Sequence, residues 1–181
     1  DQLVNQAAKM RYMFGGKISM PMVVRLPAGA GTGAAAQHSQ SLEAWLTHVP
    51  GLKVVYPSCA QDALGLMLAA IDDEDPVMYF EQKTLFGVKG EVTSLEPIPL
   101  GKGRVARPGS DLSIITYGKQ VYDALEAADK LAGEGVDVEV IDLRSLYPLD
   151  KELIGETIAK THKAIVITEE VKRGGYGGEI S

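Results

Sequence analysis

Short apolar runs alternate with amphipathic stretches along most of this chain. Buried strands are predicted at residues 22–26, 52–56 and 77–81, where each run is short, apolar and bounded by turn residues. The intervening segments at 41–47 and 63–71 place apolar side chains at helical spacing. Strands and helices in this order predict a parallel sheet covered by helices.

The same rhythm restarts after an aperiodic stretch that collects glycine and proline at residues 82–98. Further strands are predicted at 112–117, 136–141 and 164–168, with an amphipathic helix at 121–131 and a helix capped by Asp150 between them. We therefore expect an α/β fold of two consecutive three-layer units with mainly parallel sheets. The first would span residues 1–90, the linker 91–98 and the second unit 99–181.

Local patterns predict where two helices begin and end. The helix expected over residues 1–14 ends at a pair of glycines. Ser58 and Gln61 have the spacing of a capping box at the start of the helix expected around residues 63–71. The acidic run at residues 72–75 follows that helix, and it fits either a cation site or, more simply, a solvated helix end.

Residues 27–40, PAGAGTGAAAQHSQ, connect the first strand to the first internal helix. Glycine and alanine remove side-chain bulk, and four consecutive polar residues follow. Among them is His38, whose imidazole can give and take a proton near neutral pH. A loop at the carboxyl end of a strand is where α/β proteins place such groups. An ordinary strand-to-helix connection is the alternative interpretation.

The same loop contains a loose dinucleotide-binding pattern formed by Gly29, Gly31 and Ala34. That site also needs an acidic residue at the end of the next strand, which here ends at Tyr56 and Pro57 without a carboxylate. A nicotinamide site is therefore disfavoured.

Other titratable residues have less specific surroundings. His48 and His162 lie at predicted helix ends, where a cation interacts favourably with the helix dipole. Glu169 and Glu170 follow the last strand at its carboxyl end, but no third group in the sequence identifies their role.

Composition limits the classes of partner. The formal net charge is −6 and the basic residues are dispersed, which argues against nucleic acid or an anionic membrane as partner. No apolar run approaches the roughly 18 residues of a membrane span. Cys59 is the single cysteine, which excludes an internal disulfide and favours a reducing compartment.

Four segments resemble one enzyme family: DQLVNQAAKMRYMFGG, PAGAGTGAAAQHSQSLEAW, PGLKVVYPS and DLRSLYPLD. They are similar to the beta subunit of the thiamine-diphosphate-dependent decarboxylating component of 2-oxo acid dehydrogenase complexes, in the pyruvate and acetoin branch. The resemblance implies part of a pyrimidine-binding domain followed by an incomplete transketolase-type C-terminal domain, in a chain truncated at both ends. It also implies the bacterial cytoplasm or, in a eukaryote, the mitochondrial matrix.

By this resemblance, the chain works with an alpha subunit in an assembly of two alpha and two beta chains. Alpha would hold the diphosphate and magnesium, and beta the aminopyrimidine. The substrate would be a 2-oxo acid such as pyruvate, or acetoin, and the acyl group would pass to a lipoyl acyltransferase component. His38 would be the active-site histidine, acting as proton donor or stabiliser during that transfer. The main cofactor-binding residues would lie upstream or on alpha, so the chain alone is expected to be inactive.

Some members of the family also hold a structural potassium ion through main-chain oxygens. The matching positions here are Met22, Ala70, Ile71, Asp73 and Asp75, of which Asp75 replaces an amide. The alternatives are a fragment of a transketolase or deoxyxylulose-phosphate synthase, or a non-catalytic or dinucleotide-binding α/β module.

Overall fold

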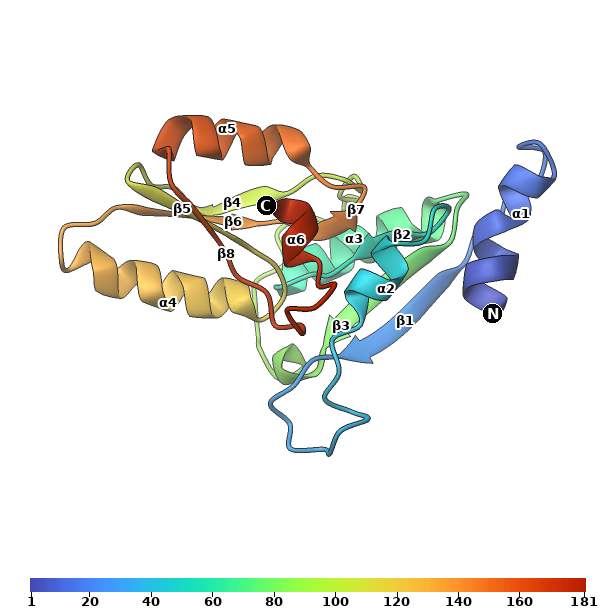
Figure 1. Cartoon of the computed structure of the whole chain (residues 1–181), viewed down its shortest axis with the longest axis horizontal. Helices are drawn as coiled ribbons and strands as arrows, with labels where there is room; N and C mark the ends of the chain where they lie inside the picture. Colours follow the sequence, from blue (N-terminus) through green and yellow to red (C-terminus); the bar gives the residue numbers. More distant parts are fainter.

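Two four-stranded sheets form the framework of the chain, in a computed structural model that describes all 181 residues (Figure 1). The first sheet has the order β1 (Val23–Ala28), β3 (Val77–Gln82), β2 (Lys53–Val55), β7 (Ser145–Tyr147). The second has the order β4 (Arg104–Arg107), β6 (Val138–Asp142), β5 (Leu112–Thr116), β8 (Ala164–Val166). Only β7 and β4 pair antiparallel with their neighbours, so the prediction of mainly parallel sheets is confirmed.

Helices pack on both sheets, whereas the N-terminal helical segment extends beyond one end of the first sheet (Figure 1). They are the π-helical η1 (Gln2–Ala7), α1 (Ala8–Met13), α2 (Glu43–Thr47), α3 (Ala60–Asp72), the 3-10 helix η2 (Lys83–Leu85), α4 (Gln120–Ala132), α5 (Lys151–Thr161) and α6 (Gly177–Ile180). Helices α4 and α5 lie on opposite faces of the second sheet (Figure 1). None of the helices combines the length and the apolar character that a membrane crossing requires.

The position of each strand in its sheet explains its burial. Strands β3 and β6 are central and almost wholly buried. Strand β1, predicted to be buried and to end before Pro27, is instead a half-exposed edge strand that includes Pro27. An edge tolerates proline because no neighbouring strand needs its missing N–H group.

The ends of two helices test the local predictions. The N-terminal helix ends at Met13, and Gly15 and Gly16 follow at positive φ, as expected. The predicted capping box is wrong: the N-cap of α3 is Cys59, without a side-chain cap. The Ser58 hydroxyl instead donates to Asp142 Oδ2 at 2.5 Å, and Gln61 Oε1 accepts from the backbone of residues 93 and 94.

Residues 86–103 contain no helix or strand and run partly along α3. Ile98 N donates to the carbonyl of Gly65 on α3 at 2.9 Å. A Cβ on Gly65 would lie 2.5 Å from the Ile98 side chain, so glycine is needed for this close approach.

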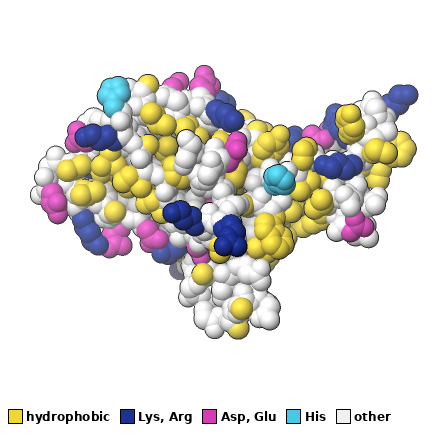
Figure 2. Space-filling model, viewed as in Figure 1, with side chains coloured by type: hydrophobic (Ala, Val, Ile, Leu, Met, Phe, Trp, Pro, Cys, Tyr) yellow, Lys and Arg dark blue, Asp and Glu magenta, His cyan; other side chains and the backbone are white.

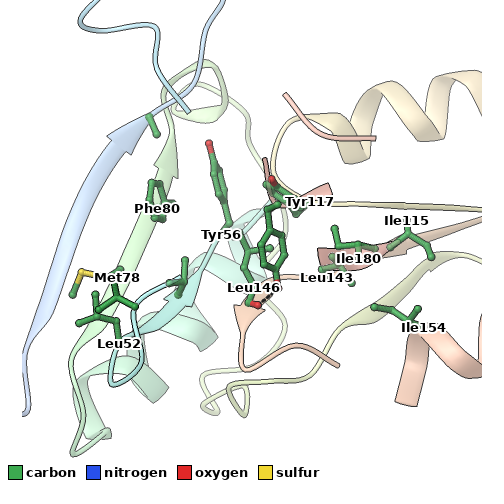
Figure 3. Close-up of a cluster of buried hydrophobic side chains, with 14 of the residues drawn as sticks. Leu52, Tyr56, Met78, Phe80, Ile115, Tyr117, Leu143, Leu146, Ile154 and Ile180 are labelled. Carbon is green, nitrogen blue, oxygen red and sulfur yellow. Dashed lines mark hydrogen bonds between the residues drawn. The ribbon is translucent and has the colours of Figure 1, made fainter. Parts of the chain in front are cut away.

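One hydrophobic core joins the two sheets (Figure 3). Its 16 buried residues include Tyr56 and Phe80 from the first sheet and Tyr117 from the end of β5. The Tyr56 ring stacks on Phe80 at 5.3 Å and meets Tyr117 at 5.5 Å between centroids. Leu146 on β7 is fully buried in the same cluster, because β7 pairs with β2 although it follows the second-sheet strands in sequence.

Buried charges cross the same junction. Arg104 on β4 binds Asp62 on α3 at 2.9 Å and Asp142 at 3.0 Å, and Arg144 binds Asp62 at 2.9 Å. Burial raises the pKa of Asp142 to about 6, although Arg104 and the Ser58 hydroxyl favour its charged form. The pairs fix the relative orientation of the two sheets, because a buried charge without its partner is strongly unfavourable.

We expect Leu146→Ala to lower the free energy of unfolding of the 181-residue chain by about 2–5 kcal/mol, because it leaves a cavity in the shared core. Leu95→Ala removes an exposed side chain and is the matched control, with an expected change within about 0.5 kcal/mol. Urea unfolding of both variants measures the difference. Equal effects would mean that the two sheets do not depend on this contact.

Candidate active site

A loop between β1 and α2, residues 29–42, extends from the carboxyl end of β1 (Figure 1). Gly29 N donates to the carbonyl of Gln40 at 3.0 Å and closes the loop at its base. Ser39 Oγ donates to the carbonyl of Ala35 at 2.7 Å within the loop. The loop contains no charged residue, and its visible surface in Figure 2 is formed by small apolar and uncharged polar groups.

His38 lies in this loop with its side chain exposed to solvent. Its neighbours use their polar groups locally: Ser39 binds Ala35, and Gln40 Nε2 donates to the carbonyl of Gln37 at 3.3 Å. The imidazole is therefore presented outward at the carboxyl edge of the first sheet. An exposed imidazole in that place can exchange a proton with a bound reactant.

The base of the loop is held by a side chain from the far end of the chain. Glu169, which follows β8, accepts a hydrogen bond from Ala30 N through Oε1. Its Oε2 accepts from Gln82 Nε2 at 2.9 Å, and Gln82 Oε1 accepts from the Tyr56 hydroxyl at 2.5 Å. The contacts connect the loop, the end of β3 and the second sheet in one network.

Gly29 is required by this network. Its φ is +90°, and a Cβ at this position would lie 2.0 Å from Gln82 Nε2. A larger residue would therefore displace the Gln82 amide from Glu169. The dinucleotide interpretation fails here, because the helix that follows the glycines begins only at Glu43 and cannot place its N-terminus against a diphosphate.

A second carboxylate is buried beside the loop. Glu43, in the first turn of α2, is 1% exposed, and its Oε1 accepts from the Tyr117 hydroxyl at 2.9 Å. Its Oε2 has no hydrogen-bond partner in the chain. Burial raises the pKa of Glu43 to about 7, with Glu170 and Glu169 adding to the rise. Burial also raises the pKa of Glu170, which accepts from Gly177 N at 3.0 Å.

Sequence reasoning missed Glu43, Tyr117 and Gln82. In the helix predicted over residues 41–47 from its apolar spacing, Trp45 is 69% exposed, whereas the charged residue Glu43 is buried. The position of Glu169 at the carboxyl end of a predicted strand is the signal that the sequence offers. Its partners could not be found, because Ala30 is 139 positions away in sequence.

The other expected site residues lie elsewhere. His48 and His162 are the C-cap residues of α2 and α5, as their sequence positions predicted. The acidic run after α3 is paired with basic side chains from other elements. Its ion pairs are Lys53 with Asp73 and Asp75, and Arg11 with Glu74 and Asp75. No group of three or more His, Cys, Asp or Glu side chains is arranged to hold a metal ion.

Glu43 should make stability depend on pH. Its folded-state pKa of about 7 exceeds the usual 4.5, so over this window the folded chain holds a proton that the unfolded chain releases. The free energy of unfolding should therefore fall, by up to about 3 kcal/mol from this group, as pH rises from 4.5 to 7. Urea unfolding at several pH values should show Glu43→Gln becoming more stable relative to the unsubstituted chain across this window.

Glu134→Gln, at an exposed position after α4, is the control and should not change its relative stability in this way. Comparison with the unsubstituted chain also removes the contribution of Asp142, whose pKa shifts in the same direction. A constant difference between Glu43→Gln and the unsubstituted chain would contradict the prediction.

Two family descriptions match nearly the whole chain. Residues 2–89 match "Transketolase, pyrimidine binding domain", and residues 101–181 match "Transketolase, C-terminal domain". A solved structure described as "Split gene transketolase, inactive beta4 tetramer" has a TM-score of 0.81 and 26% sequence identity, over 99% of this chain and 55% of that one.

Curated relatives are more similar in sequence. The acetoin:2,6-dichlorophenolindophenol oxidoreductase subunit beta of Cupriavidus necator is 50% identical, over 100% of this chain and 54% of that protein. The 2-oxoisovalerate dehydrogenase subunit beta of Bacillus subtilis is 46% identical, over 100% of this chain and 56% of that protein. The mitochondrial pyruvate dehydrogenase E1 component subunit beta-2 of Oryza sativa subsp. japonica is also 46% identical, over 99% of this chain and 49% of that protein.

The chain thus spans about half the length of the curated relatives it matches. It belongs to the transketolase-like family, as the four resembling segments predicted, with a pyrimidine-binding domain followed by a C-terminal domain and with dehydrogenase beta subunits among its relatives.

Proposed function

We propose that this chain is part of the beta subunit of a thiamine-diphosphate-dependent 2-oxo acid or acetoin dehydrogenase. The observation that carries the proposal is the presentation of His38 on an exposed, glycine-rich loop at the carboxyl edge of the first sheet. Identity of 43–50% to beta subunits over essentially the whole chain supports the same class. The proposed division is a first unit at 1–90, a linker at 91–98 and a second unit at 99–181.

In this proposal His38 donates a proton as the acyl group passes to the lipoyl dithiolane. Thiamine diphosphate supplies carbanion stabilisation when bound, and the protein supplies proton transfer and orientation. The loop leaves the imidazole unengaged by its neighbours, and the network at its base fixes where it stands.

The residues of this chain do not by themselves fit a diphosphate. The polar side chains that meet at the loop base are carboxylates, an amide and tyrosines, without a cation among them. We therefore assign the diphosphate and its magnesium to an alpha subunit, and the aminopyrimidine side to the beta subunit. The same proposal includes a heterotetramer of two alpha and two beta chains, a lipoyl acyltransferase partner, and the bacterial cytoplasm or mitochondrial matrix as compartment.

A transketolase with its domains on separate chains is the second candidate, favoured by the structural likeness to the split gene transketolase. Its lower identity of 26%, against 46–50% for the dehydrogenase subunits, makes it the weaker one. The acceptor distinguishes the two reactions: the dehydrogenase transfers its group to lipoamide, and the transketolase transfers its group to a sugar phosphate. That structure is described as an inactive tetramer of beta chains, which agrees with our expectation that this chain alone is inactive.

In a full-length beta subunit reconstituted with its alpha partner, we expect His38→Ala to slow acyl transfer to lipoamide by about 10²–10⁴-fold, because the general acid is lost. His48→Ala, at the end of α2 outside the loop, is the matched control and should retain full activity. Acyl-lipoamide formation under saturating substrate measures both. Unimpaired transfer by His38→Ala would reject the assigned role.

A structural potassium ion belongs to the same proposal. The carbonyl oxygens of Ala70, Ile71, Asp73 and Asp75 accept no backbone hydrogen bond outside the regular elements, whereas that of Met22 accepts from Val77 N at 2.9 Å. Free carbonyls at the end of α3 suit a hard monovalent cation. The carboxylates of Asp73 and Asp75 are directed to Lys53 and need not ligate the ion.

Potassium should therefore raise the free energy of unfolding of the 181-residue chain saturably, by about 2.7 kcal/mol at a concentration 100 times its dissociation constant. Sodium and choline chloride at equal ionic strength are the controls. Equal stabilisation by all three salts would contradict a specific site.

A further inference from the structure

The Glu169 carboxylate accepts hydrogen bonds from two groups that lie on different parts of the chain. Oε1 accepts from Ala30 N, the second residue of the loop, and Oε2 accepts from Gln82 Nε2 at the end of β3. In Figure 1 the segment after β8 turns towards the base of the loop, which brings Glu169 there from the second sheet. The carboxylate thus connects the loop to the strand beside it.

Ala30 lies at the start of the loop, next to the strand from which the loop extends. It lies between Gly29 at φ +90° and Gly31 at φ +92°, two residues whose backbones can rotate with little steric cost. A hydrogen bond from a backbone N–H to a carboxylate is stronger than one between neutral groups. Glu169 therefore fixes the one residue between two hinges.

The opposite end of the loop adds a second constraint. The bond from Gly29 N to the Gln40 carbonyl ties the two ends together, so residues 30–40 form one closed unit whose base is fixed. His38 lies within this unit and makes no side-chain hydrogen bond that would hold it independently. Its position relative to the sheet edge then depends on the anchor at Ala30.

We propose that Glu169 is a positioning residue that sets the place of the His38 loop through its bond to Ala30 N. The inference rests on the proposed function for its catalytic consequence, but not for its structural one. The second unit thereby contributes to the reaction a residue that acts through the position of His38. Gln82 Nε2 donates to the other carboxylate oxygen, and the Tyr56 hydroxyl donates to Gln82 Oε1, so the anchor is held in place.

The structural consequence is tested by amide hydrogen exchange of the 181-residue chain, measured by NMR. Glu169→Ala should accelerate exchange at Ala30 by about 10-fold or more, because the charge-assisted bond is lost. Glu169→Gln keeps one acceptor oxygen for Ala30 N and should restore part of the protection, because its amide NH2 cannot accept from Gln82 Nε2. Glu156→Ala, an exposed glutamate on α5, should change nothing.

Exchange at the buried core residue Ile115 distinguishes a local effect from general destabilisation. Faster exchange at Ala30 alone supports the positioning role. Equal acceleration at both residues, or no change at Ala30, would overturn it.

The catalytic consequence is tested in the reconstituted alpha–beta enzyme. Glu169→Ala should lower kcat for acyl transfer about 10- to 100-fold and leave KM for the 2-oxo acid unchanged, with partial rescue by Glu169→Gln. Adding Glu169→Ala to His38→Ala should produce no further loss, because both act through one imidazole. Multiplicative losses would overturn the proposed route.

The two proposals can fail separately. If His38→Ala alone retains full activity, the proposed function fails, and the exchange rate at Ala30 then decides whether Glu169 sets the loop. If His38→Ala is impaired but Glu169→Ala leaves Ala30 protected, the function stands and the positioning role is overturned.

Discussion

The structure depends on the burial of apolar side chains between its two sheets. Tyr56 and Phe80 of the first sheet and Tyr117 of the second form a continuous aromatic contact, and β7 completes the first sheet with a strand that follows β6 in sequence. Separation of the sheets would expose this core and break the ladder between β2 and β7. The two family domains are therefore distinct in sequence but share one core and one sheet.

Buried polar groups give that joint a defined orientation. Apolar contact is non-directional, whereas the pairs of Arg104 and Arg144 with Asp62 allow one arrangement of α3 relative to the second sheet. A further buried hydrogen bond, from the Tyr117 hydroxyl to Glu43, orients α2 relative to the second sheet. Desolvation makes such groups unfavourable unless they are paired, so their presence at the junction favours one docked geometry rather than maximal stability.

The sequence was informative where the determinants are local. The central strand β3 reads as a mostly apolar run, and Asp150 caps α5 by accepting from Leu153 N as predicted. Strands β4 and β7 were missed because they have four and three residues and owe their pairing to distant neighbours. The predicted cap at Ser58 failed for the same reason, since its partner Asp142 is 84 positions away.

The candidate site likewise has a part that local sequence predicts and a part that it does not. His38 could be predicted because glycine-rich loop chemistry and an imidazole occur within a few residues. Its supports, Glu169, Gln82 and Tyr56, are brought together by docking of the second sheet, so no local pattern assigns them this role. A loop with glycine hinges gains freedom to approach a reactant closely but loses a defined position. That position has to come from elsewhere in the fold, and the docked second sheet is the element that can provide it.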